Sequence, residues 1–242
     1  MNTYRLLEKE LGQTIRLTVL TPESERGPSR LVVFSHGNGG AGALYRRLAE
    51  HLVRADFVVA LPDHPGNTRT DNRLAGTAAN LEARPKHVKT VIDWAFDASP
   101  FAGTLKRDTA AILGHSLGGY TALAAAGDAR VKALVLLAPA TLWFQAPGSL
   151  DHVDVPILMF TAGQDEHTPA PHAEVVARGL PDPTLLEHQV IRNAGHFSFL
   201  DPFPPEKTSP AFAPSQDPPG FDRSRFLDDL GPLVAAFLER VL

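Results

Sequence analysis

A serine at the centre of a glycine-flanked turn is the residue best placed to do chemistry. The segment Gly114-His115-Ser116-Leu117-Gly118 follows a β-rich run at 109–113 and precedes a helical pattern that starts at Gly119. A sharp strand–turn–helix of this kind needs glycine on both sides of the serine, because no side chain fits there. A serine hydroxyl becomes a good nucleophile only when a neighbouring base takes its proton. The turn therefore predicts Ser116 as a nucleophile, together with a histidine and a carboxylate later in the chain.

Two such residues follow predicted strands. Asp165 comes just after the run 156–161, and His196 lies on a loop of small residues after the run 185–191. Functional groups of open α/β sheets gather beyond the carboxyl ends of the strands. We therefore expect His196 to act as general base for Ser116 and Asp165 to orient it. Glu166 is the alternative acid, and His167 and His172 are the alternative bases.

Acyl transfer at a serine also requires N–H donors for the developing oxyanion. The turn offers the backbone amide of Leu117, and the glycine-rich segment 35–40 after another predicted strand offers that of Asn38. Three plainer interpretations compete: a turn with a solvated serine, Asp165 as a surface or helix-capping residue, and a phosphate-binding loop at 35–40. The last is weakened because no G-x-x-x-x-G-K-[ST] or G-x-G-x-x-G pattern occurs.

The elements that must position these residues alternate between strands and helices. Nearly continuous apolar runs, typical of strands covered on both faces, occupy 31–35, 57–61, 109–113, 131–136 and 156–161. The run 185–191 carries polar residues and predicts an edge strand, and the alternation at 15–19 predicts an antiparallel strand. Helical stripes occupy 44–53, 85–96, 119–126, 171–180 and 226–242, with Pro85 expected in a first turn. The pattern predicts one α/β domain over 1–242 with a mostly parallel, doubly wound sheet.

Composition excludes several classes of protein. The 242 residues carry a net charge of −4, spread along the chain, which gives no electrostatic footprint for nucleic acid. Zero cysteines remove disulfides, iron–sulfur clusters and cysteine-ligated zinc, and no histidine pair has a metal-binding spacing on one helix. We expect neither metal nor cofactor. Charges among the first ten residues, and the lack of a long apolar run, favour a soluble cytoplasmic protein without a membrane span.

Proline is unusually dense in one segment. Of the 21 prolines, those at 202, 204, 205, 210, 214, 218 and 219 fall close together. Proline lacks the backbone N–H that helices and central strands need. The segment must be a long, stiff loop, either a linker to the last helix or a wall beside the site that starts six residues after His196.

Over essentially its whole length the chain resembles the α/β-hydrolase superfamily, above all bacterial predicted dienelactone hydrolases and platelet-activating-factor-acetylhydrolase-like esterases. The resemblance is carried by the segments 34–40, 62–68, 84–85, 114–120, 195–200 and 217–223. It implies serine-esterase chemistry without a cofactor. Dienelactone hydrolases use a cysteine nucleophile, whereas position 116 is serine.

The segment 138–153 leaves room only for a small lid. Within it Trp143 and Phe144 are expected either to bind the acyl group or to pack in the core. An open cleft favours small to medium carboxylic esters as substrates. The alternatives are a peptidase, amidase or thioesterase with the same three residues, and a noncatalytic binding protein of the same fold.

Overall fold

The computed structural model describes residues 1–23 and 27–242 and contains an eight-stranded sheet. Its strand order is β1-β2-β4-β3-β5-β6-β7-β8, and every pairing from β4 to β8 is parallel. β1 and β2 are antiparallel to their neighbours. The strands are Asn2–Glu8, Gln13–Leu20, Ser29–Ser35, Phe57–Asp63, Leu105–His115, Val131–Leu137, Ile157–Ala162 and Leu186–Ile191, in chain order from β1 to β8. This is the expected doubly wound, mostly parallel sheet.

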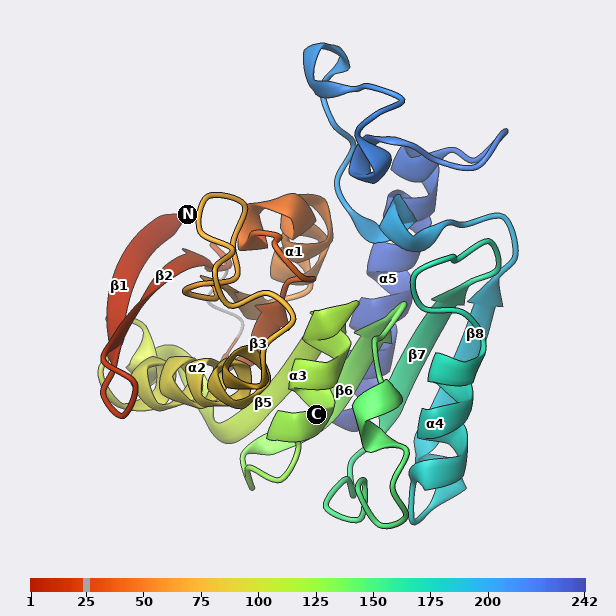
Figure 1. Ribbon diagram of the computed structural model, residues 1–242. Helices are drawn as coiled ribbons and strands as arrows, with labels where there is room; N and C mark the ends of the chain where they lie inside the picture. Colours follow the sequence, from red (N-terminus) through yellow and green to blue (C-terminus); the bar gives the residue numbers. More distant parts are fainter. Residues whose placement is uncertain (24–26) are drawn as a thin grey trace.

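Helices cover both faces of this sheet (Figure 1). They are α1 (Arg46–Arg54), α2 (Ala78–Asp97), α3 (Leu117–Ala125), α4 (Pro171–Gly179) and α5 (Arg223–Val241). α2, α3 and α4 pack on one face and α1 and α5 on the other. Successive strand residues point to opposite faces, so β3 places Leu31 and Val33 in the first core and Val32 and Phe34 in the second. Because both faces are buried, the central strands are continuous apolar runs.

The sequence-based boundaries need two corrections. β1 was not predicted, because it is an edge strand in which most positions are exposed; only Leu6 and Glu8 are buried, and Arg5 is exposed. α2 begins at Ala78, seven residues before Pro85, and the Thr77 side chain caps it by accepting from the Asn80 amide. Pro85 therefore lies inside the helix, where packing against the sheet outweighs the hydrogen bond that proline cannot make.

The predictions for β8, β2 and the proline-rich segment agree with the structure. β8 is an edge strand, and β2 is antiparallel to both neighbours. The proline-rich segment between residues 200 and 222 contains only short 3₁₀ turns, at Pro205–Lys207 and Ala213–Ser215, and stands above the carboxyl ends of the strands (Figure 1). Among the described residues, no helix is both long and apolar enough to cross a membrane.

Candidate active site

Ser116 lies at a strained turn between β5 and α3. Its backbone has φ 55° and ψ −120°, a conformation that a non-glycine residue adopts only when its surroundings enforce it. The Ser116 amide donates to the carbonyl of Leu137 on the adjacent strand, at 3.0 Å. A Cβ on Gly114 would meet the Gly118 carbonyl oxygen at 2.0 Å. The flanking glycines are therefore required sterically, as the sequence pattern predicted.

The structure brings Ser116, His196 and Asp165 into one hydrogen-bonded row. His196 Nδ1 lies 2.8 Å from Asp165 Oδ2, and His196 Nε2 lies 3.0 Å from Ser116 Oγ. Because a carboxylate only accepts, Nδ1 carries the proton and the lone pair of Nε2 faces the serine hydroxyl. The histidine and aspartate side chains are 5% and 1% exposed, so bulk water does not compete for their hydrogen bond.

The Asp165 carboxylate is held by its own turn. Oδ1 accepts from the amides of His167 and Thr168, both at 2.8 Å, and the Thr168 hydroxyl lies 2.8 Å from Oδ2. Burial by itself raises the pKa of Asp165, but the hydrogen bond and charge of His196, with the bonds from Thr168, outweigh it and hold that pKa below its usual range. Asp165 is therefore ionised at neutral pH. Thr168 was not recognised in the sequence, where only the T-P pair after Asp165 hinted at a structured turn.

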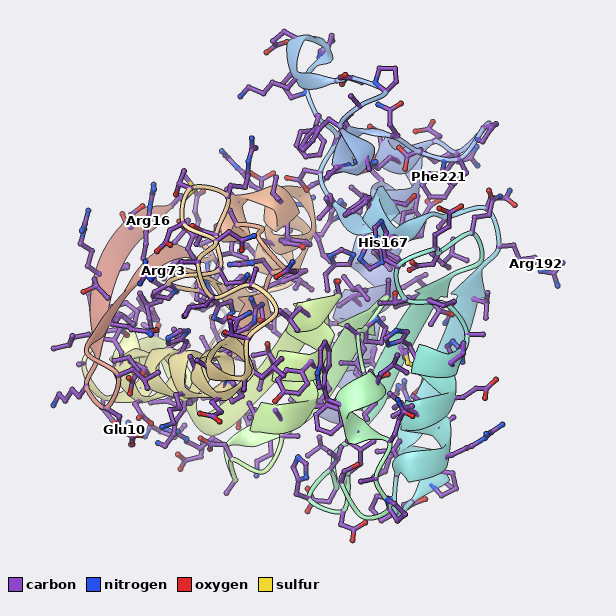
Figure 2. The ribbon with its side chains drawn as sticks, viewed as in Figure 1. Glu10, Arg16, Arg73, His167, Arg192 and Phe221 are labelled. Atoms are coloured by element: carbon purple, nitrogen blue, oxygen red, sulfur yellow. The ribbon has the colours of Figure 1, made fainter. Side chains whose placement is uncertain are left out.

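The alternative acid and bases occupy other positions. Glu166 is exposed and makes none of these hydrogen bonds. His172 Nδ1 accepts from the Thr141 amide at 2.9 Å, which ties α4 to the turn after β6. His167 lies among the loops above the carboxyl ends of the central strands (Figure 2), with its ring centroid 4.8 Å from that of His196. It stands beside the hydrogen-bonded row and is not part of it.

Two backbone amides are available beside the serine. Within residues 1–23 and 27–242, neither the Asn38 nor the Leu117 amide donates to an acceptor. The Asn38 side chain is fixed, because its Oδ1 accepts from Asn67 Nδ2 at 2.8 Å. The neighbouring Gly37 amide donates to the Tyr45 hydroxyl at 3.2 Å. The turn at 36–40 is thus held in place while the Asn38 amide stays free for a ligand.

His115 connects the two sides of the site, a role that sequence reasoning did not assign. Its Nε2 lies 2.9 Å from the carbonyl oxygen of His196, and since a carbonyl only accepts, Nε2 carries the proton. Its Nδ1 then accepts from the Tyr45 hydroxyl at 2.9 Å. Burial lowers the pKa of His115 to about 3, so the ring is neutral at pH 7 and this bonding pattern is stable.

A cavity of about 770 Å³ opens onto Ser116 and His196. Trp143, one of the two residues expected either to bind the acyl group or to pack in the core, lines it. Phe144 does not line it and takes the second of these expectations: it is 9% exposed and stacks on Tyr120 with ring centroids 5.2 Å apart. The 3₁₀ turn at Leu142–Phe144 places adjacent side chains in different directions, so one reaches the cavity while the other joins the core.

The proline-rich segment forms part of the cavity wall. Phe203, Phe212 and Pro214 line the cavity, and the two phenylalanine rings meet edge-to-face at 5.2 Å. Arg223, 5% exposed at the start of α5, anchors this segment by donating to the carbonyls of Pro214 and Gln216. The segment is therefore a wall of the site, one of the two interpretations that the sequence left open.

Arg223 also couples this wall to the histidine loop. Its Nε donates to Asp217 Oδ2 at 2.8 Å, and Asp217 Oδ1 accepts from the Ser198 hydroxyl at 2.7 Å. Ser198 Oγ in turn accepts from the Gly195 amide, next to His196.

In the described part of the chain, no group of three or more His, Cys, Asp or Glu side chains could hold a metal ion.

Comparison with known protein families supports the observed fold. The family model described as the alpha/beta hydrolase fold matches residues 30–152, about half of the chain. The chain belongs to this family. The matched region of this hydrolase-fold protein covers the candidate nucleophile and both candidate oxyanion donors, whereas Asp165 and His196 lie beyond it.

Individual relatives support the expected resemblance. The chain is 23% identical to platelet-activating factor acetylhydrolase of Cavia porcellus, over 79% of this chain and 55% of that protein. It therefore spans about half the length of that curated relative. Among solved structures, a dienelactone hydrolase from Anabaena variabilis matches with a TM-score of 0.67 at 20% identity, covering 100% and 98% of the two chains. Est1E from Butyrivibrio proteoclasticus, solved with ferulic acid, matches with a TM-score of 0.71 at 15% identity over 98% of each chain. These structural similarities show a shared fold.

Proposed function

We propose that this protein is a serine hydrolase that cleaves carboxylic esters with small to medium acyl groups. The observation that carries the proposal is the row Asp165–His196–Ser116, with a lone pair of His196 facing the serine hydroxyl. Two further observations support it: the unpaired amides of Asn38 and Leu117, and the largely apolar cavity above the serine. Two of the similar proteins are an acetylhydrolase and a dienelactone hydrolase, which agrees with this chemistry.

The proposed reaction uses this arrangement of side chains and amides. His196 Nε2 takes the proton of Ser116 Oγ as the oxygen attacks the ester carbonyl carbon. The carbonyl oxygen becomes an oxyanion, which the amides of Asn38 and Leu117 stabilise. The imidazolium that forms is stabilised by ionised Asp165, and it returns the proton to the leaving alcohol. Water then enters, gives a proton to His196, and attacks the acyl-enzyme to release the acid and regenerate Ser116.

The test is hydrolysis of p-nitrophenyl acetate and butyrate by the parent and by Ser116→Ala. We expect the variant to lose at least 10³-fold in kcat/KM while its circular dichroism and melting temperature stay close to those of the parent. A fluorophosphonate probe should label the parent and leave the variant unlabelled. Equal hydrolysis by both proteins would overturn the proposal.

Matched esters, thioesters and amides then separate the related activities. We expect esters to be cleaved fastest, because an ester leaving group needs less proton transfer than an amine. A higher kcat/KM for the matched amide or thioester would reassign the reaction class while keeping the nucleophile.

A further inference from the structure

The side chain of Asn80 has an unusual environment. Asn80 is 1% exposed and belongs to the wall of the cavity above Ser116. Neither its Oδ1 nor its Nδ2 has a hydrogen-bond partner in the described part of the chain. Among the described residues, the only other buried side-chain nitrogen or oxygen without a partner is one nitrogen of Arg30. An unpaired buried polar group destabilises the fold, because it has lost its hydrogen bonds to water without gaining others. Such a cost at a cavity wall needs a functional explanation.

The position of Asn80 on α2 places it on the wall of the cavity that opens onto Ser116. Arg84 lies one helical turn further on, on the same face of α2, and donates to Thr121 of α3. Thr121 in turn donates to the carbonyl of Leu117, the residue after the nucleophile. From Arg84 towards the start of α2, this face continues to Asn80 and then to Thr77, which also lines the cavity. Asn80 therefore lies where α2 meets the substrate space.

The chemistry of the cavity restricts what could pair with Asn80. The surface that lines it is mostly apolar, and Leu44, Leu81, Leu200 and Phe203 contribute to it. A carboxamide offers both a donor and an acceptor, so a ligand group that also donates and accepts satisfies both unpaired atoms. We propose that Asn80 is a specificity residue that binds a hydroxyl group on an otherwise apolar ester substrate. This inference rests on the proposed ester hydrolysis and names its substrate class.

The test uses pairs of esters that differ by one hydroxyl in place of a methyl group. For the acyl side the pair is p-nitrophenyl 3-hydroxybutyrate and 3-methylbutyrate; for the alcohol side it is 2-hydroxyethyl and propyl butyrate. The readout is the ratio of kcat/KM within each pair. We expect Asn80→Leu to lower this ratio at least 10-fold relative to the parent in one of the two pairs, because the leucine cannot bond the hydroxyl.

Two controls separate a loss of hydroxyl recognition from a general loss of activity or stability. Glu82→Gln, an exposed change two residues further along α2, should leave both ratios unchanged. Asn80→Leu should also melt no lower than the parent, because it removes an unpaired buried amide. Ratios equal in Asn80→Leu and the parent for both pairs would overturn this inference, while Ser116-dependent cleavage of the same esters would leave the proposed function standing. If none of the four esters is cleaved in a Ser116-dependent way, the proposed function itself fails.

A second inference stands on a different residue. Arg84 is completely buried, and no carboxylate of the described residues forms an ion pair with it. Its guanidinium donates to neutral groups only: the carbonyl of His36 and the side chains of Thr121, Asn67 and Ser35. Burial lowers the pKa of Arg84 to about 9, so the group remains charged at neutral pH. A buried cation without a counter-ion is costly to maintain.

The neighbours of Arg84 connect it to both candidate oxyanion donors. Asn67 accepts from Arg84 at 2.7 Å and donates to the Asn38 side chain at 2.8 Å. Thr121 accepts from Arg84 at 2.9 Å and donates to the Leu117 carbonyl at 3.0 Å. One cation therefore joins the two segments whose amides face the site, and it leaves a net positive charge behind them. We infer that Arg84 is a positioning residue that aligns these two amides and favours the developing oxyanion.

The surrounding histidines leave this charge uncompensated. Burial, followed by the charge of Arg84, lowers the pKa of His36 to about 3 and that of His87 to about 4, and places that of His64 well below its usual value. All three rings are therefore neutral at pH 7. They fill polar positions around the guanidinium without adding or cancelling charge; His64, for example, pairs with Ser35 at 2.8 Å.

The test separates this role from simple stabilisation of the fold. A trifluoromethyl ketone adds to the serine: Ser116 Oγ bonds to the ketone carbon, the serine proton passes to His196, and the ketone oxygen becomes an oxyanion. We expect Arg84→Met to lower kcat for p-nitrophenyl butyrate 10- to 100-fold with KM changed less than threefold. The affinity for the ketone should fall by the same factor as kcat/KM, because both report oxyanion stabilisation.

Two further variants cover the case in which Arg84→Met does not fold. Arg84→Lys keeps the charge but loses the forked geometry. Asn67→Ala removes the link from Arg84 to Asn38, together with the Asn67–Asn72 hydrogen bond, and leaves the link through Thr121 in place. Each variant should show a smaller, parallel fall in kcat and ketone affinity. A lower melting temperature with kcat and ketone affinity unchanged in the folded variants would overturn the inference and leave Arg84 with a purely structural role.

Discussion

The steric requirement at Gly118 predicts a severe effect from adding a single methyl group. A Cβ at this position would lie 2.0 Å from the carbonyl oxygen of Ser35, about 1.4 Å short of ordinary contact at 3.4 Å. The same Cβ would lie 2.7 Å from the Ser35 carbonyl carbon and 3.1 Å from the His36 oxygen. These are backbone atoms at the end of the central strand β3, so no flexible side chain can yield. The backbone of Gly118 is not in the left-handed region, so the effect is steric.

Relief requires α3 and the end of β3 to separate by about 1 Å. Overpacking in a core usually costs about 1–3 kcal/mol, and a clash with rigid backbone belongs at or above the upper end. The same movement separates the amide of Leu117 from that of Asn38. Displacement of catalytic groups by about 1 Å costs on the order of 10²-fold in rate. We therefore expect Gly118→Ala to lose about 3 kcal/mol in free energy of unfolding and at least 10²-fold in kcat/KM.

The assay combines urea unfolding with hydrolysis of p-nitrophenyl butyrate. Gly103→Ala is the matched control, because a Cβ there meets no atom within 4 Å. The control should stay within about 0.5 kcal/mol of the parent and retain its activity. If Gly118→Ala keeps its kcat/KM within threefold and its free energy of unfolding within 1 kcal/mol of the parent, the steric reasoning about this turn is refuted.

Three further predictions concern the acid, the cavity wall and pH. Asp165→Asn should lower kcat about 10³- to 10⁴-fold with little loss of fold, because an amide no longer holds the His196 proton on Nδ1; retention of a tenth of the activity would contradict this. Arg223→Met should lower the free energy of unfolding by about 3 kcal/mol, because it removes the hydrogen bonds that anchor the proline-rich segment. It should also raise KM more for hexanoate than for acetate esters, because this segment contributes Phe212 to the cavity wall. An equal change in KM for both esters would contradict the prediction. The free energy of unfolding should fall as pH drops below about 6.5, because the unfolded chain protonates His36 and His115, whereas burial lowers their pKa to about 3 in the folded protein. Each histidine should lower the free energy of unfolding by up to about 2 kcal/mol at pH 5. A free energy of unfolding that stays constant between pH 7 and 5 would refute this.

Much of the fold could be predicted because its signals are local. The central strands are apolar on both faces, so their identity does not depend on register or neighbours. The exceptions are instructive. β1 has only one buried face, and its single buried apolar residue, Leu6, lies among exposed positions, so the sequence resembles a surface segment. The start of α2 was placed too late because Pro85 looks like a first-turn residue, whereas the helix begins at Ala78 after the Thr77 cap, and Arg84 bonds to α3 before Pro85 is reached.

The candidate site divides in the same way. Ser116, Asp165 and His196 could be picked from the sequence because each follows a strand of a parallel sheet, and parallel strands end at the same edge. The order of the strands in the sheet is therefore enough to bring these three residues to the same edge. The choice between Asp165 and Glu166 needed the structure, because adjacent residues of a turn point in different directions and only Asp165 reaches His196.

The sequence by itself determined the strained turn at Ser116 and the sheet that carries it, because steric exclusion around a turn and burial of strand faces act over a few residues. Only the tertiary structure decided which distant polar groups support that turn. Arg84 meets Asn67, Thr121 and Ser35 across 17, 37 and 49 residues of chain, and no spacing rule relates them. These hydrogen bonds form because the guanidinium of Arg84 is buried and must find acceptors nearby. The acceptors come close to it only when the helices have packed on the sheet.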